Sequence, residues 1–300
     1  MPRDADKAIA LRSKCKDFRI LVIGRANAGK TTLFEERSLS NVEGSAERGV
    51  HNIGNQLRFK SNRQFVFHDS RGFESGSEDE LNKVTAFIAE RAASKHLSDQ
   101  LHAIWYCVPT DTNRPLLATD EQFFNTNITG KGESPLSWTK WRTQYDDEVP
   151  VIAIFTKFDG LLNEAFSQLM DEGDDWEDAQ EGQIEQARKM LTTNFEGPLR
   201  SSEFPPADYV RLDDMRVETS NCNELIEKTA NALTDNTLRL LFISVQQNNI
   251  DFCIRYAMTK GLFRETKVKA LLTSTLAHFP HVWRVRCFVL HRPGRLADAK

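Results

Sequence analysis

Eight residues near the amino terminus have the types and the spacing of a loop that binds phosphate. They run from Gly24 to Thr31, read GRANAGKT, and fit the pattern G-x-x-x-x-G-K-[ST]. Glycines let the backbone curl so that successive N–H groups point inward at phosphate oxygens. Lys30 can then reach the β- and γ-phosphates of a nucleotide, and the Thr31 hydroxyl can ligate Mg²⁺. The predicted nucleotide-binding residues of this segment are Gly24, Asn27, Ala28, Gly29, Lys30, Thr31 and Thr32.

The residues on either side supply the context that this pattern needs. Residues 18–23 form an apolar, β-branched run that stops at a glycine, which predicts a buried strand. Residues 32–36 read as the start of a helix, whose first turn adds partial positive charge facing the phosphates. Strand, loop and helix in this order predict a P-loop NTPase.

Two later segments follow predicted strands and narrow the choice of nucleotide. Asp69-Ser-Arg-Gly72 ends the run 65–68, and Thr156-Lys-Phe-Asp159 directly follows the run 151–155. A carboxylate at Asp159 can accept two hydrogen bonds from guanine N1 and N2, which adenine cannot supply. Because the wrong base would leave a buried charge unpaired, such a site discriminates strongly. The sequence therefore predicts GTP rather than ATP.

With these three segments the chain resembles the G-domain GTPases of the Ras-like and septin-like superclass, and also single-G-domain GTP-binding proteins common in fungi. The resemblance covers roughly residues 17–235. It implies a doubly wound sheet with the ligand at the carboxyl ends of the strands. It also implies that Asp69 holds Mg²⁺ through water and that the Gly72 N–H senses the γ-phosphate. Thr156, Lys157 and Asp159 would form the base site, with the Lys157 stem packed over the guanine.

Two stretches compete for the loop that donates a backbone N–H to the guanine O6 in this family. Residues 212–214 (LDD) stand at the end of a predicted strand, where the loop belongs. Residues 218–221 (ETSN) are closer to the sequence pattern of the family and precede a predicted helix. Both alternatives stay open.

The chain departs from the family where hydrolysis is concerned. No threonine occurs between Thr32 and Thr85, although a switch threonine normally closes on Mg²⁺ in that interval. The residue after Gly72 is Phe73, and a phenyl ring cannot orient an attacking water. We therefore expect slow or partner-assisted hydrolysis and leave the catalytic residues unassigned. The weak candidates are Arg48, His51 and His68.

Further strands and helices are needed to position the three motif segments. A hairpin is expected over residues 57–60 and 64–68, and a helix after the capping box at 77–80. Buried strands are expected near 101–108, 149–155 and 209–212, with a helix following the last. Strands alternating with helices predict a three-layer α/β/α P-loop NTPase fold with a mostly parallel, doubly wound sheet.

The predicted organisation is a polar leader over 1–16, a G domain over 17–235 and a mainly helical C-terminal extension over 236–300. Insertions are expected near 126–149 and 161–204, and the acidic run 171–181 in the second is interpreted as a solvated helix face. The apolar and aromatic residues 279–290 are expected to form a core element, with contact to a membrane surface as the alternative.

Composition excludes several other classes of protein. A hydrophobic content of 40% is too high for disorder, and a net charge of −4 gives no field for nucleic acid. The five cysteines are scattered without a CxxC pair, and neither a signal peptide nor an 18-residue apolar window occurs. These features predict a cytoplasmic protein without a transmembrane segment.

The leading functional hypothesis is a Mg²⁺-dependent GTP-binding switch with GTPase activity. A GTP-bound scaffold that does not hydrolyse its nucleotide is the first alternative, and an ATP-dependent enzyme is the second. The expected partners are an effector protein or a second copy of the chain across the nucleotide, as in septin-like relatives.

Overall fold

The computed structural model describes residues 15, 17–35, 42–43, 52–59, 62–73, 78–112, 114–128, 149–213 and 222–246. Most of the leader, most of the insertion near 126–149 and the extension beyond residue 246 lie outside these ranges. The predicted capping residue Ser77 lies outside them too.

The core is a sheet of five parallel strands in the order β4-β1-β5-β6-β7. Its strands are β1 (Phe18–Gly24), β4 (Phe65–Asp69), β5 (Ala103–Pro109), β6 (Val151–Thr156) and β7 (Asp208–Leu212). Every residue of β1, β5 and β6 is buried. This burial explains why these strands read as unbroken apolar runs rather than as alternating patterns.

A short antiparallel pair stands beside this sheet. Strand β2 (Val42–Glu43) pairs with β3 (Arg58–Phe59). The expected pairing of the segments at 57–60 and 64–68 is present, because Leu57 and Phe67 exchange backbone hydrogen bonds of 2.8 and 2.9 Å.

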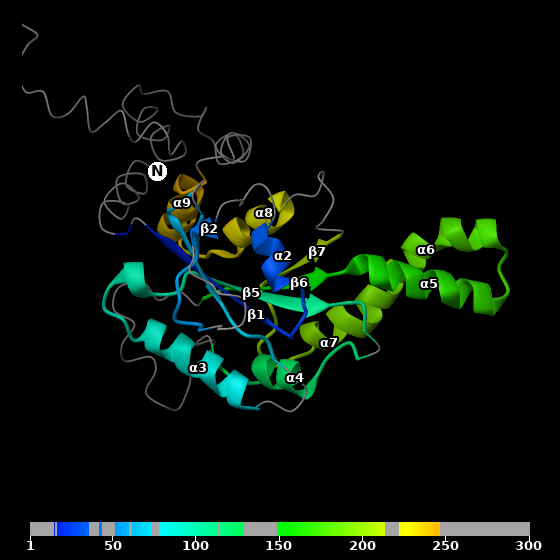
Figure 1. Cartoon of the computed structure of the whole chain (residues 1–300), viewed down its shortest axis with the longest axis horizontal. Helices are drawn as coiled ribbons and strands as arrows, with labels where there is room; N and C mark the ends of the chain where they lie inside the picture. The colour runs from blue at the N-terminus through cyan, green and yellow to red at the C-terminus, as the bar shows by residue number, and fades with distance from the viewer. Residues whose placement is uncertain are drawn as a thin grey trace, which may run out of the picture.

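Helices cover both faces of the sheet, as Figure 1 shows. Helices α2 (Lys30–Glu35), α8 (Asn223–Ala232) and α9 (Asn236–Ser244) lie on one face, and α3 (Glu78–Ala92), α4 (Ala118–Phe124) and α7 (Gly197–Arg200) on the other. Alternate residues of β1 supply the two cores: Ile20 and Val22 belong to the first, Leu21 and Ile23 to the second. The expected three-layer α/β/α P-loop NTPase fold is confirmed.

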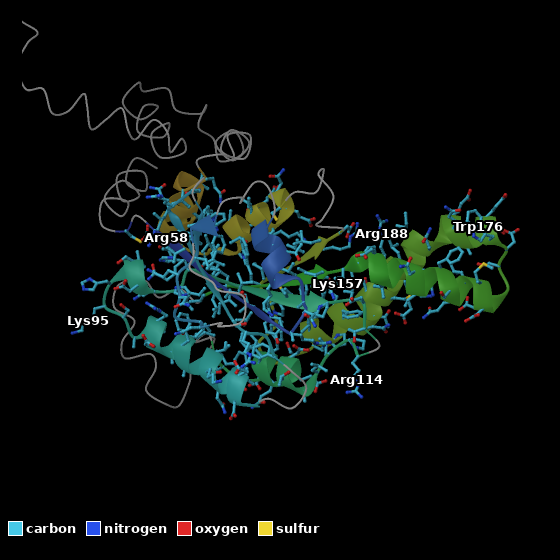
Figure 2. All side chains as sticks on the ribbon, viewed as in Figure 1. Arg58, Lys95, Arg114, Lys157, Trp176 and Arg188 are labelled. Atoms are coloured by element: carbon cyan, nitrogen blue, oxygen red, sulfur yellow. The ribbon has the colours of Figure 1, made fainter. Side chains whose placement is uncertain are left out.

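A helical hairpin extends from one end of the sheet (Figure 1). Helix α5 (Phe158–Glu172) turns at Gly173 into α6 (Trp176–Leu191), whose first turn is capped by the Asp175 carboxylate. A π-helical segment (Thr192–Glu196) continues into α7. Nearly all of the acidic run 171–181 is exposed, and Trp176 marks the far end of the hairpin (Figure 2).

Helix α9 packs into the hydrophobic core on one face of the sheet. The Phe242 ring lies 4.7 Å from the Phe18 ring and 5.8 Å from the Phe65 ring, centroid to centroid. Asn62 Nδ2 also donates to the Val245 carbonyl, which ties the end of this helix to the turn before β4. The first residues of the predicted extension thus pack back on the sheet. In the described part of the chain, no helix has the length and apolar character needed to cross a bilayer.

Candidate functional site

The three motif segments lie at the same edge of the sheet. The GRANAGKT loop follows β1, Asp69 ends β4, and Thr156 ends β6. Because these strands are parallel, their carboxyl ends meet at one edge, which is where open α/β sheets bind ligands.

The phosphate loop has the curled backbone that its sequence predicts. Asn27 and Gly29 adopt φ angles of 60° and 74°, and asparagine is among the few residues that tolerate this region. Ala28 is fully buried, while Asn27 is exposed. The backbones of Lys30, Thr31 and Thr32 form the first turn of α2, but the Thr31 side chain lies outside what the structure describes.

Lys30 is a buried cation held by neutral oxygens. Its ammonium donates to the carbonyls of Gly24 (3.1 Å) and Arg25 (2.6 Å), and its side chain is 6% exposed. Burial lowers the pKa of Lys30, while Cys107 and Asp69 act in the opposite direction. Within the described ranges no carboxylate pairs with it at ion-pair distance. An anion arriving beside Lys30 would therefore offset a desolvation cost that the surrounding protein groups offset only in part.

The DSRG segment is joined to this loop through the backbone. Phe73 N–H donates to the Gly24 carbonyl (3.0 Å), and Ala26 N–H donates to the Phe73 carbonyl (2.9 Å). Gly72 passes so close that an added Cβ would lie 2.7 Å from Lys30 Nζ and 2.8 Å from the Ala26 nitrogen. The Phe73 ring is buried and stacks on Tyr106 at 6.1 Å, so it points into the core.

The TKFD segment is also tied to the phosphate loop. Thr156 Oγ1 donates to the Ala28 carbonyl at 3.0 Å. Lys157 has φ 59° and its ammonium pairs with Asp111 at 2.9 Å. Asp159 is exposed in the first turn of α5. Lys157 thus lies where the hairpin leaves the sheet (Figure 2).

Sequence reasoning missed two residues that brace this segment. Thr110 Oγ1 donates to the carbonyls of Thr156 (3.0 Å) and Lys157 (3.1 Å), and Asp111 holds the Lys157 ammonium. Both follow β5 directly, so they reach the same edge of the sheet as the motifs. Their position after a buried strand was the available signal.

The structure places His68 in the protein interior, packed between strand and helix. Its Nδ1–H donates to the Ile53 carbonyl (2.8 Å), and its Nε2 accepts from Arg19 Nη1 (3.0 Å). The ring lies 4.9 Å from that of Phe87 in α3, and burial is the main cause that lowers its pKa to about 4. Both ring nitrogens are therefore occupied by protein groups. The other weak catalytic candidates, Arg48 and His51, lie outside the described residues.

The two alternatives for the O6 loop remain. Asp213 follows β7 at the correct edge, and the ion pair of its carboxylate with Arg211 at 2.8 Å leaves its backbone N–H uninvolved. Asp214 and the competing segment 218–221 lie outside the described residues.

Comparison with known proteins completes this description. No protein-family model and no curated protein sequence matches the chain. Among solved structures, the G domain of the T. maritima FeoB iron transporter is 13% identical with a TM-score of 0.35, over 72% of this chain and 98% of that one. A GDP-bound mutant of S. thermophilus NFeoB is 14% identical with a TM-score of 0.38, over 87% and 77%. The choice of nucleotide therefore depends on this chain's own residues.

Proposed function

We propose that the chain binds GTP and GDP with Mg²⁺ and acts as a molecular switch with slow or partner-assisted hydrolysis. One observation carries this proposal: three segments far apart in sequence converge on one edge of the sheet and are joined there by hydrogen bonds. Thr156 joins the base segment to Ala28, and Phe73 joins the DSRG segment to Gly24. A shared phosphate and base site explains all these contacts together.

The residues present suit a nucleotide with its metal. Lys30 supplies a buried positive charge for the β- and γ-phosphates. Mg²⁺ prefers oxygen ligands and usually takes one or two from protein side chains and the rest from phosphates and water. The Thr31 hydroxyl would ligate the metal directly and Asp69 would hold it through water, and the bound metal would neutralise charge on the phosphates. Gly72, beside Lys30, brings a backbone N–H to the γ-phosphate end.

Guanine recognition is assigned to Asp159 and Lys157. An exposed carboxylate in the first turn of α5 is accessible to the base edge, and the braced Lys157 offers its stem to the ring. Both lie at the same sheet edge as the phosphate loop.

For the turnover of GTP, a specific observation favours the scaffold alternative. Phe73 turns its ring into the core, so the position after Gly72 offers no group to orient water. The proposal therefore includes a partner, either an effector protein or a second copy across the nucleotide, that supplies a group to orient the attacking water. A reducing, cytoplasmic setting is part of the same proposal.

The first experiment measures base preference. Nucleotide released from the purified full chain is identified by chromatography, and the affinities for fluorescent GDP and ADP are then compared. Asp159→Asn should weaken GDP binding by about tenfold or more and improve binding of xanthosine diphosphate, because the amide pairs with the xanthine edge instead. Asp171→Asn removes the same charge from the exposed hairpin and should change neither affinity. Equal affinity for both bases would refute the guanine assignment.

A second experiment separates a switch from a scaffold. Single-turnover hydrolysis of GTP with Mg²⁺ is followed over hours, alone and with cell extract. Slow turnover that extract accelerates supports the switch, whereas complete retention of GTP under both conditions supports the scaffold.

A further inference from the structure

Arg25 lies inside the phosphate loop, yet its side chain turns away from Lys30 and is buried. Its Nε and Nη2 both donate to Asp120 Oδ2, at 2.8 and 2.6 Å. Its Nη1 donates to the Arg114 carbonyl at 2.7 Å, and its Nη2 to the Pro115 carbonyl at 2.6 Å. One guanidinium thus joins the phosphate loop to the connection between β5 and α4, at the end of the sheet where Arg114 is labelled in Figure 2.

The Asp120 carboxylate, which accepts hydrogen bonds from Arg25, is also hydrogen-bonded through both of its oxygens to other groups. Asp120 has no exposed surface, its Oδ1 accepts from the Tyr106 hydroxyl (2.6 Å), and its Oδ2 accepts from the Leu117 N–H (2.8 Å). Burial, followed by the charge of Asp120, raises the pKa of Tyr106 well above its ordinary value, so the phenol stays a donor. A buried ion pair with every partner satisfied holds one geometry rigidly.

Fixing the Arg25 side chain also fixes the Arg25 backbone. The Arg25 carbonyl accepts from Lys30 Nζ (2.6 Å) and from the Ala28 N–H (3.3 Å). Arg25 also forms an isolated parallel bridge with Phe73, next to Gly72. The same residue therefore orients the phosphate-binding lysine and the neighbouring DSRG segment.

We infer that Arg25 and Asp120 are a positioning pair that holds the phosphate loop and Lys30 in binding geometry and so slows the release of nucleotide. This inference rests on the proposed nucleotide site. Neither the Arg25 side chain nor the Asp120 side chain would contact the bound nucleotide. Their effect passes through the Arg25 carbonyl to Lys30.

If the Arg25–Asp120 pair only stabilised the fold, its loss would affect stability but not nucleotide release. A double variant distinguishes this purely structural role from the positioning role. Arg25→Met alone leaves the Asp120 carboxylate buried without its cation, which destabilises the protein whatever the pair does for binding. Arg25→Met combined with Asp120→Asn removes both charges. The asparagine oxygen can still accept from Tyr106, although the Leu117 N–H then loses its side-chain acceptor. Stability should then return toward the parental value. Release of nucleotide should remain fast only if the pair positions the loop.

The test measures dissociation of fluorescent GDP from the full chain, together with the urea midpoint of each variant. Arg25→Met and the double variant should each release nucleotide about tenfold faster or more, and Arg25→Lys should be intermediate because lysine keeps the charge but not the fork. Trp105→Phe is the matched control. It breaks the buried hydrogen bond to Thr229 on the opposite face of β5 and should change the release rate by less than about twofold.

The outcomes of these measurements distinguish a failure of the inference from a failure of the proposed function. A double variant with parental release rate overturns the inference, even if Arg25→Met is too unstable to measure. A parental protein that binds no guanine nucleotide overturns the proposed function and the inference with it. Parental binding with unchanged release in the variants overturns the inference alone.

Discussion

Replacing Gly72 by alanine tests how closely the DSRG segment approaches the phosphate loop. Gly72 has a φ angle of +99°, a region that residues with a Cβ rarely adopt. The added Cβ would lie 2.8 Å from the Ala26 nitrogen and 2.9 Å from its Cα. These are backbone atoms of a loop fixed by hydrogen bonds, so the loop itself must shift. Lys30 Nζ, at 2.7 Å, would be displaced as well.

A second glycine with a similar φ angle allows the two costs to be separated. Gly173 has a φ angle of +103°, but an added Cβ there meets nothing within 4 Å. Gly173→Ala should therefore cost only the backbone term, about 1–2 kcal/mol of unfolding free energy. Gly72→Ala should cost that amount plus crowding of about 1–3 kcal/mol, so the difference between the variants measures the contact with the loop.

The assay is urea unfolding of both variants without nucleotide, followed by dissociation of fluorescent GDP. Gly72→Ala should be the less stable and should release nucleotide faster, whereas Gly173→Ala should release it at the parental rate. If the two variants lose the same stability, the close approach of Gly72 to Ala26 is wrong.

Two other predictions concern buried titratable groups. His68 and His102 each have a folded pKa of about 4, below the ordinary 6.5, chiefly because of burial. The unfolded chain therefore binds more protons between these values, so stability is full above pH 6.5 and falls by about 2 kcal/mol per histidine between pH 7 and 5. Urea midpoints that do not change between pH 7 and 5 would contradict the lowered pKa values of the two histidines. Lys30→Met removes a buried cation and should stabilise the nucleotide-free protein by about 1 kcal/mol while weakening GDP binding by about a hundredfold or more, measured by urea unfolding and titration. Unchanged affinity would count against the whole site.

Much of the fold could be predicted because its signals are local. Strands buried on both faces, such as β1 and β6, must be apolar throughout, and this run is visible without any knowledge of their neighbours. The curl of GRANAGKT likewise depends on residues that permit positive φ within the segment itself. The acidic hairpin was harder to predict. The run 171–181 indicated a solvated helix face, but not that α5 and α6 would pack mainly on each other.

Contacts between distant loops could not be predicted, because strand order and not sequence distance sets them. His68 stands next to Asp69, yet neighbouring residues of a strand face opposite sides, and its nitrogens are occupied by Ile53 and Arg19. Arg25 and Asp120 are 95 residues apart, and nothing in either neighbourhood indicates a buried pair.

Local patterns in the sequence therefore sufficed to predict a phosphate loop, the residues that line it and the kind of sheet that carries it. The contacts that hold that loop in place became visible only in the folded chain. Motif residues are selected for the ligand that they meet, so their pattern is local. The Gly72 approach, the Thr110 brace and the Arg25 ion pair arise where parallel strands bring separate chain segments to one edge, and that juxtaposition exists only after folding.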